Sequence, residues 1–173
     1  PTPTPLPYTV ADRFRPIWES LGGAEGRLGN PVGKAVFDDF CAKQSFASGY
    51  MFWRNNQLYP GRDYNEIYTI AYTEGNDRAG KRWRVFKDLW APPTPEYQCM
   101  NAKPPLGPKR GFGAIWCDRA EVQREVGKPL QEEATTAGGF QDFEGGVMLW
   151  VDLDHAVFVL FEDDHSWQRF DVP

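Results

Sequence analysis

The sequence predicts an α+β, mainly β fold of two tandem repeats, each a short helix followed by a small antiparallel β meander. Three observations predict it. The chain aligns with itself, a proline-rich segment separates the aligned parts, and short apolar runs follow a helix-like segment in each part. With 7 Trp, 7 Tyr and 12 Phe in 173 residues, large rings let each small module bury much area.

The self-alignment rests on rare residues that match in the same order. A shift of 98 positions aligns Phe14 with Phe112, and after one deleted residue a shift of 97 aligns Trp53 with Trp150. We expect the matched aromatic residues to form a repeated structural core. They are Phe14, Trp18, Phe46, Trp53 and Trp83 in the first copy, and Phe112, Trp116, Phe143, Trp150 and Trp167 in the second.

The alignment divides the chain into repeat modules at residues 9–90 and 111–173, joined by a proline-rich linker at 91–110. Prolines at this density exclude regular structure from the linker. Residues 1–8 form a further linker, in which alternating Pro and Thr favour an extended polyproline II spacer. Such spacers commonly tether extracellular modules, so we interpret the chain as part of a longer exported or surface-anchored polypeptide. A cytoplasmic linker is the alternative.

Local signals place a short helix at the start of each module. Pro16 suits the first turn of a helix, and Gly22-Gly23 supplies a left-handed stop. The equivalent segment of the second module, residues 114–126, lacks the glycine pair and should be more helical.

The strands follow from apolar runs that are too short for helices. In the second module, residues 147–151, 156–161 and 167–170 predict a three-stranded meander with tight turns between its strands. The first module follows the same course, with longer polar connections at 54–66 and 73–82. Loops carry function more often than the scaffold, so we expect the two copies to differ in use there.

Charge and cysteine usage exclude several classes of protein. The net charge is −5 and the Lys and Arg residues are scattered, so the basic patch of a nucleic-acid-binding protein is missing. The longest apolar runs fall short of the roughly 18 residues of a membrane span, so we expect no membrane insertion. Cys41, Cys99 and Cys117 lack the close spacing of zinc ligands, and a Cys99–Cys117 bridge or three free thiols are both open.

Catalytic chemistry has few candidates in this sequence. The histidines His155 and His165 lie near acidic residues in the turns of the second module, namely Asp152, Asp154, Asp163 and Asp164. Turns favour such residues because they face water, so we expect Asp152, Asp154, His155 and His165 to contribute little to fold or activity. Phosphate-binding, nucleophile-elbow and zinc-protease motifs are also missing. We therefore predict no catalytic residue, no metal and no cofactor.

One motif recurs in both modules. Leu28-Gly29-Asn30-Pro31 precedes a Phe-x-x-Gly-x-x-x-Trp segment at residues 46–53, and Val126-Gly127-Lys128-Pro129 precedes the same pattern at 143–150. This pattern resembles the LGFP repeats of bacterial cell-envelope proteins and covers the first two-thirds of each copy. The resemblance implies association with the cell wall, often as an accessory beside a catalytic domain, and it brings no catalytic residues.

Aromatic residues without a counterpart in the other copy are the candidate ligand-binding residues. Tyr59 and Tyr64 lie in the long loop of the first module, and Trp90 and Tyr97 lie at the linker. Their flat faces suit sugar rings and protein partners alike; alternatively, they pin loops against the core.

The leading hypothesis is a non-catalytic binding or attachment module, extracellular or at the bacterial cell surface. Its partner would be cell-wall polysaccharide or an envelope protein. One alternative is a structural spacer or docking domain of a larger surface protein. Another is a small hydrolase that uses the acidic turns of the second module.

Overall fold

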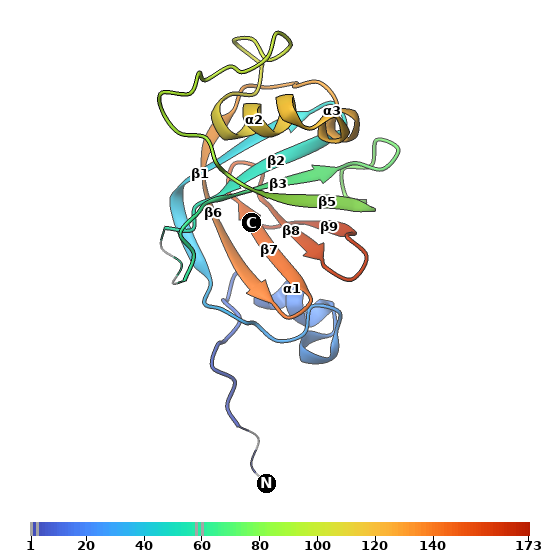
Figure 1. Cartoon of the computed structure of the whole chain (residues 1–173). Helices are drawn as coiled ribbons and strands as arrows, with labels where there is room; N and C mark the ends of the chain where they lie inside the picture. The colour runs from blue at the N-terminus through green and yellow to red at the C-terminus, as the bar shows by residue number, and fades with distance from the viewer. Residues whose placement is uncertain (1, 3, 58, 60) are drawn as a thin grey trace.

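The chain folds mainly into antiparallel β structure (Figure 1). The computed structural model describes residues 2, 4–57, 59 and 61–173. Within these residues, nine strands form one sheet. The strands of residues 9–90, the first half, are β1 (Val36–Phe46), β2 (Gly49–Arg54), β3 (Glu66–Ala71), β4 (Ala79–Gly80) and β5 (Arg82–Lys87). Those of residues 111–173, the second half, are β6 (Ala134–Phe143), β7 (Gly146–Val151), β8 (Ala156–Phe161) and β9 (Trp167–Asp171).

The sheet curls into a nearly closed barrel. Its order is β4-β9-β8-β7-β6-β1-β2-β3-β5, so the two halves join where β1 pairs with β6. On the other side, β4 pairs with β9 and is followed after one residue by β5, which pairs with β3. The backbone N–H of Trp83 in β5 also donates to the carbonyl of His165 at 3.1 Å. The chain thereby nearly closes the sheet and leaves few strand edges unpaired.

Short helices cover the outside of the barrel. They are α1 (Arg15–Ser20), a 3₁₀ turn η1 (Gly23–Glu25), α2 (Arg110–Asp118) and α3 (Ala120–Val126). Pro16 lies in the first turn of α1, and Gly22 follows that helix with a φ of 98°, which confirms the start and stop signals. The second half is the more helical one, as its sequence predicted.

Each helical segment packs on strands of the other half. Phe14, just before α1, and Ile17 within it form a buried cluster with Met148 and Trp150 of β7. Conversely, α2 and α3 lie over β2 and β3 in Figure 1, and their apolar residues form a second outer cluster on those strands. The members of that cluster include Phe46, Met51, Ile67, Phe112, Trp116, Val122 and Val126. The barrel interior holds a third cluster, which includes Tyr50, Phe52, Phe140, Leu149, Phe158 and Trp167.

The ten predicted core aromatics lie in these clusters. Eight of them are buried, while Trp18 and Trp53 are half-buried. The expected three strands in each meander are too few, because β1 and the two-residue β4 extend the first half to five strands and β6 extends the second half to four. Polar and small residues interrupt the apolar pattern of both long strands, as at Asp38 in β1 and Gly138-Gly139 in β6.

Of the two cysteine arrangements left open by the sequence, the structure contains the one with a single disulfide bridge. Cys99 and Cys117 form a bridge with a Cα–Cα distance of 5.8 Å, which ties the proline-rich segment to α2. Cys41 is a buried free thiol, and burial is the main cause that raises its pKa to about 12. In the described part of the chain, no helix is both long and apolar enough to cross a membrane.

Candidate functional site

An open aromatic pocket lies where β1, β2 and the segment after β5 meet α2 and the start of β6. Trp90, Trp53 and Phe40 border a cavity of about 300 Å³, and Phe40 is 71 % exposed. Trp90 and Gly111 also line a neighbouring groove of about 640 Å³ between β5 and α2. Cavities of this size are typical of small-ligand sites. Three aromatic side chains from β1, β2 and the segment after β5 therefore converge on one open surface.

Asp88, the residue after β5, contacts both tryptophans of the pocket, through the indole of Trp53 and the backbone of Trp90. Its carboxylate accepts the Trp53 Nε1–H at 2.8 Å and the backbone N–H of Trp90 at 3.1 Å. Gly111 permits this approach, because a Cβ at that position would lie 2.5 Å from Oδ1 of Asp88. The glycine of α2 thus leaves room for the carboxylate that accepts these two hydrogen bonds.

The second carboxylate of the pocket belongs to Glu133, just before β6. Its side chain is 15 % exposed, and its nearest cation is the Arg110 guanidinium at 3.9 Å. Burial is the largest influence and raises the pKa of Glu133, with Glu96 and Asp88 acting in the same direction. Lys109 and Arg110 act in the opposite direction. Arg110 itself is engaged by Glu96 at 2.8 Å.

Of the four predicted ligand-binding residues, Trp90 lines this pocket. Tyr59 is half-buried and packs on the interior ring of Phe140, with centroids 5.9 Å apart, as the loop-pinning alternative expects. The ring of Tyr64 lies 4.3 Å from the Lys87 ammonium, and Tyr97 is half-buried in the proline-rich segment. The pocket residues that the sequence reasoning missed are Phe40, Asp88, Arg110 and Glu133, together with Trp53, which it assigned to the core.

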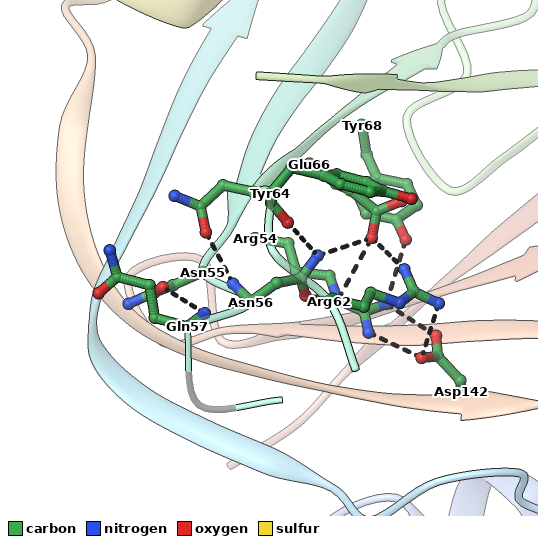
Figure 2. A network of polar contacts seen from close by, with 10 residues as sticks. Arg54, Asn55, Asn56, Gln57, Arg62, Tyr64, Glu66, Tyr68 and Asp142 are labelled. Atoms are coloured by element: carbon green, nitrogen blue, oxygen red, sulfur yellow. Dashed lines mark hydrogen bonds and ion pairs between the residues drawn. The ribbon is translucent and has the colours of Figure 1, made fainter. Parts of the chain in front are cut away.

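A buried polar network lies inside the barrel (Figure 2). Arg54, at the end of β2, is fully buried and donates two hydrogen bonds of 2.7 Å to the carboxylate of Asp142 in β6. Its Nε donates to Asn56 at 2.7 Å, and its plane lies over the Phe140 ring at 3.6 Å. Burial is the largest single influence and opposes the charge of Arg54, but Asp142, Tyr68 and Glu66 together outweigh it and raise the pKa.

Glu66 completes this network on the side of β3. It accepts hydrogen bonds from Asn56 at 2.9 Å and from Arg62, and Arg62 also lies 3.5 Å from Asp142. The network therefore pairs two guanidinium groups with two carboxylates and links β2 and β3 of the first half to β6 of the second. Because its charges are matched, its geometry fits a structural role that fixes how the halves meet.

The acidic turns of the second half do not converge on one site. His155 and His165 lie beyond opposite ends of the six-residue strand β8, so roughly 20 Å of strand separates them. Asp163 and Asp164 both bind Arg27, at 2.5 and 2.8 Å. Among the described residues, no group of His, Cys, Asp and Glu could hold a metal ion.

The expectation that the turn residue Asp154 faces water and contributes little to the fold is wrong. Asp154 accepts hydrogen bonds from Lys43 at 2.9 Å and from the Tyr50 hydroxyl at 2.5 Å. Burial, followed by the Asp154 carboxylate, raises the pKa of Tyr50. The turn that contains Asp154 is therefore anchored to β1 and β2 of the first half.

Comparison with protein-family models, with curated proteins and with solved structures found no match.

Proposed function

We propose that this chain is a non-catalytic module that binds cell-wall polysaccharide through the pocket of Phe40, Trp53 and Trp90. One observation carries the proposal: three aromatic side chains, one of them 71 % exposed, border a single open cavity with carboxylates beside them. Aromatic faces offer flat apolar area with polar edges, which matches the C–H faces of a pyranose ring. Asp88, Arg110 and Glu133 supply acceptors and donors for its hydroxyl groups.

Tandem duplication of one helix-and-meander unit, with modules at 9–90 and 111–173, is part of this proposal. Equivalent hydrogen bonds support it. Trp18 Nε1–H donates to the Gly29 carbonyl at 2.8 Å, and its aligned residue Trp116 donates to the Gly127 carbonyl at 3.1 Å. The side chain of Gln44 donates to the Gln131 carbonyl, and that of its aligned residue Gln141 donates to the Gly33 carbonyl.

The contacts between the halves are reciprocal as well. Pro31 forms an isolated antiparallel β-bridge with Phe143, and the residues aligned with these two, Pro129 and Phe46, form another. The one-residue change of alignment has a physical counterpart in β1, whose pairing with β6 shifts by one residue between Asp38 and Cys41. A β-bulge accommodates one extra residue in one strand, so the gap in the self-alignment coincides with an irregularity of the sheet.

An extracellular or surface location, with the chain as part of a longer polypeptide, fits the disulfide. Bridges such as Cys99–Cys117 form and persist in oxidising compartments. The bacterial cell wall as the partner rests on the resemblance of the Leu-Gly-x-Pro and Phe-x-x-Gly-x-x-x-Trp segments to LGFP repeats. An envelope protein that docks in the same pocket is the alternative ligand, and a structural spacer is the alternative role. The hydrolase alternative loses support because Asp154, Asp163 and Asp164 are ion-paired and its histidines lie far apart.

Sedimentation with insoluble cell-wall material tests the proposal. Trp90→Ala should lower the bound fraction at least tenfold and leave the melting temperature close to that of the parent chain. Leu153→Ala is the matched control, because Leu153 is another exposed apolar side chain but lies in a turn of the second half. Equal binding by the parent chain and Trp90→Ala would contradict the proposed site.

A further inference from the structure

The two aligned tryptophans, Trp53 and Trp150, have different surroundings. The Arg13 guanidinium lies over the Trp150 ring, 3.7 Å from its centroid, and the Phe37 ring meets the same indole edge-on at 6.0 Å. This face of Trp150 is therefore occupied by a cation of the chain itself.

At Trp53, smaller residues stand at the aligned positions. Gly111 aligns with Arg13, and Thr135 aligns with Phe37. Both line the cavity beside Trp53. The cavity of about 300 Å³ beside Trp53 thus lacks the arginine and phenylalanine side chains that line the equivalent cavity, of about 630 Å³, beside Trp150.

The charges beside Trp53 suit an external cation. Asp88 and Glu133 both line the cavity, while its arginine, Arg110, is bound by Glu96 at 2.8 Å. The Glu133 carboxylate makes no hydrogen bond to the described residues, and its side chain is 15 % exposed. Lys109 and Arg110 already act on this carboxylate, with the Arg110 guanidinium 3.9 Å away, but a partly buried carboxylate still gains more from a cationic ligand in contact with it than an exposed one does. Cations also bind favourably over indole faces.

We propose that this pocket binds the free ammonium group of an amino sugar, so that the recognised glycan contains de-N-acetylated glucosamine-type units. The inference rests on the proposed glycan-binding function and names its ligand class. The ammonium lies between the Trp53 and Trp90 rings and the Glu133 carboxylate, and the pyranose ring stacks on an indole face. Neighbouring sugar units extend along the adjoining groove of about 640 Å³, which shares Trp90 with the pocket.

The test is isothermal titration calorimetry of the whole chain in 150 mM salt, which screens contacts between exposed charges. The probes are a β-1,4-linked glucosamine hexamer and its fully N-acetylated counterpart. We expect the free-amine hexamer to bind at least about tenfold more tightly, in line with a charge-assisted contact. Glu133→Gln should remove this preference without abolishing binding.

A blocking variant separates pocket binding from general attraction between an acidic protein and a cationic glycan. Thr135→Phe places a ring where the other half has Phe37 and keeps the net charge, so it should weaken binding of the free-amine hexamer about tenfold. Leu153→Ala should bind as the parent does. Melting curves of each variant show whether the fold is retained.

Three outcomes would overturn the inference. Equal affinity for both hexamers would refute amino-sugar selection and leave glycan binding in place. Unchanged binding by Thr135→Phe would place the contact elsewhere on the acidic surface. Failure of both hexamers to bind would refute the amino-sugar inference. If sedimentation with cell-wall material still depends on Trp90, the proposed glycan-binding function would stand. If sedimentation does not depend on Trp90, that function would be refuted as well.

Discussion

Removal of the Asp142 carboxylate should be among the most damaging single changes in this protein. Asp142→Ala leaves the Arg54 guanidinium fully buried without its bidentate partner, and both of the lost hydrogen bonds are 2.7 Å long. Breaking one side of a buried ion pair costs about 3–5 kcal/mol. For a chain of this size, that loss corresponds to a fall in melting temperature of roughly 6–20 °C.

Urea unfolding followed by tryptophan fluorescence measures this loss. The double variant Arg54→Met with Asp142→Leu should recover most of the stability, because both charges leave the interior together. Asp164→Ala is the control, since that carboxylate pairs with Arg27 on the exposed surface and should change stability little. A loss below about 1 kcal/mol for Asp142→Ala would refute the argument that this pair is a buried structural link between the halves.

Further predictions follow from the same structure. Trp150→Ala should lower the free energy of unfolding by about 3–5 kcal/mol, because a large buried ring is deleted; a shift near zero in thermal melts would mean that the ring is a surface platform. Reduction of Cys99–Cys117 should cost roughly 3 kcal/mol, since it releases a loop with a sequence separation of 18, and melts with and without reductant measure it. Asp154→Ala should destabilise the fold, because Lys43 and the Tyr50 hydroxyl lose their acceptor; unchanged urea curves would contradict this. Affinity for the free-amine hexamer should rise as the pH increases through and just above the ordinary range of a glutamate, because burial raises the pKa of Glu133 and the ammonium binds its ionised form, and it should fall again at the higher pH where the sugar ammonium loses its proton; a flat series below neutral pH would show that Glu133 takes no part.

Local signals predicted the parts of the fold that depend on neighbouring residues. Pro16 and Gly22 marked the ends of α1 through their own backbone preferences, and the apolar runs of β7 and β8 marked those strands. The strands β1 and β6 were missed because each pairs with the other half, and the partner strand decides which of their polar residues become buried. Lys43, which lies opposite Ala134 of β6, is buried and contacts Asp154 in the turn between β7 and β8.

The site was harder to predict because its residues come from distant parts of the chain. Trp90 was singled out because it has no counterpart in the other half, whereas Trp53 was assigned to the core for the opposite reason. The pairing of Arg54 with Asp142 spans 88 positions, and no local pattern encodes it. Glu133 stands beside Trp53 only because β6 pairs with β1.

NMR observation of the tryptophan indole N–H signals during titration with the glucosamine hexamer tests the central claim most directly. The sequence has 7 Trp, and each gives its own signal once single substitutions have assigned it. Trp53 donates to Asp88 and Trp90 to the Pro95 carbonyl at the pocket, whereas Trp167 donates to the Ala71 carbonyl in the interior. The account predicts that the Trp53 and Trp90 signals move on binding while that of Trp167 stays fixed. Movement of other indoles with Trp53 and Trp90 unchanged would contradict it.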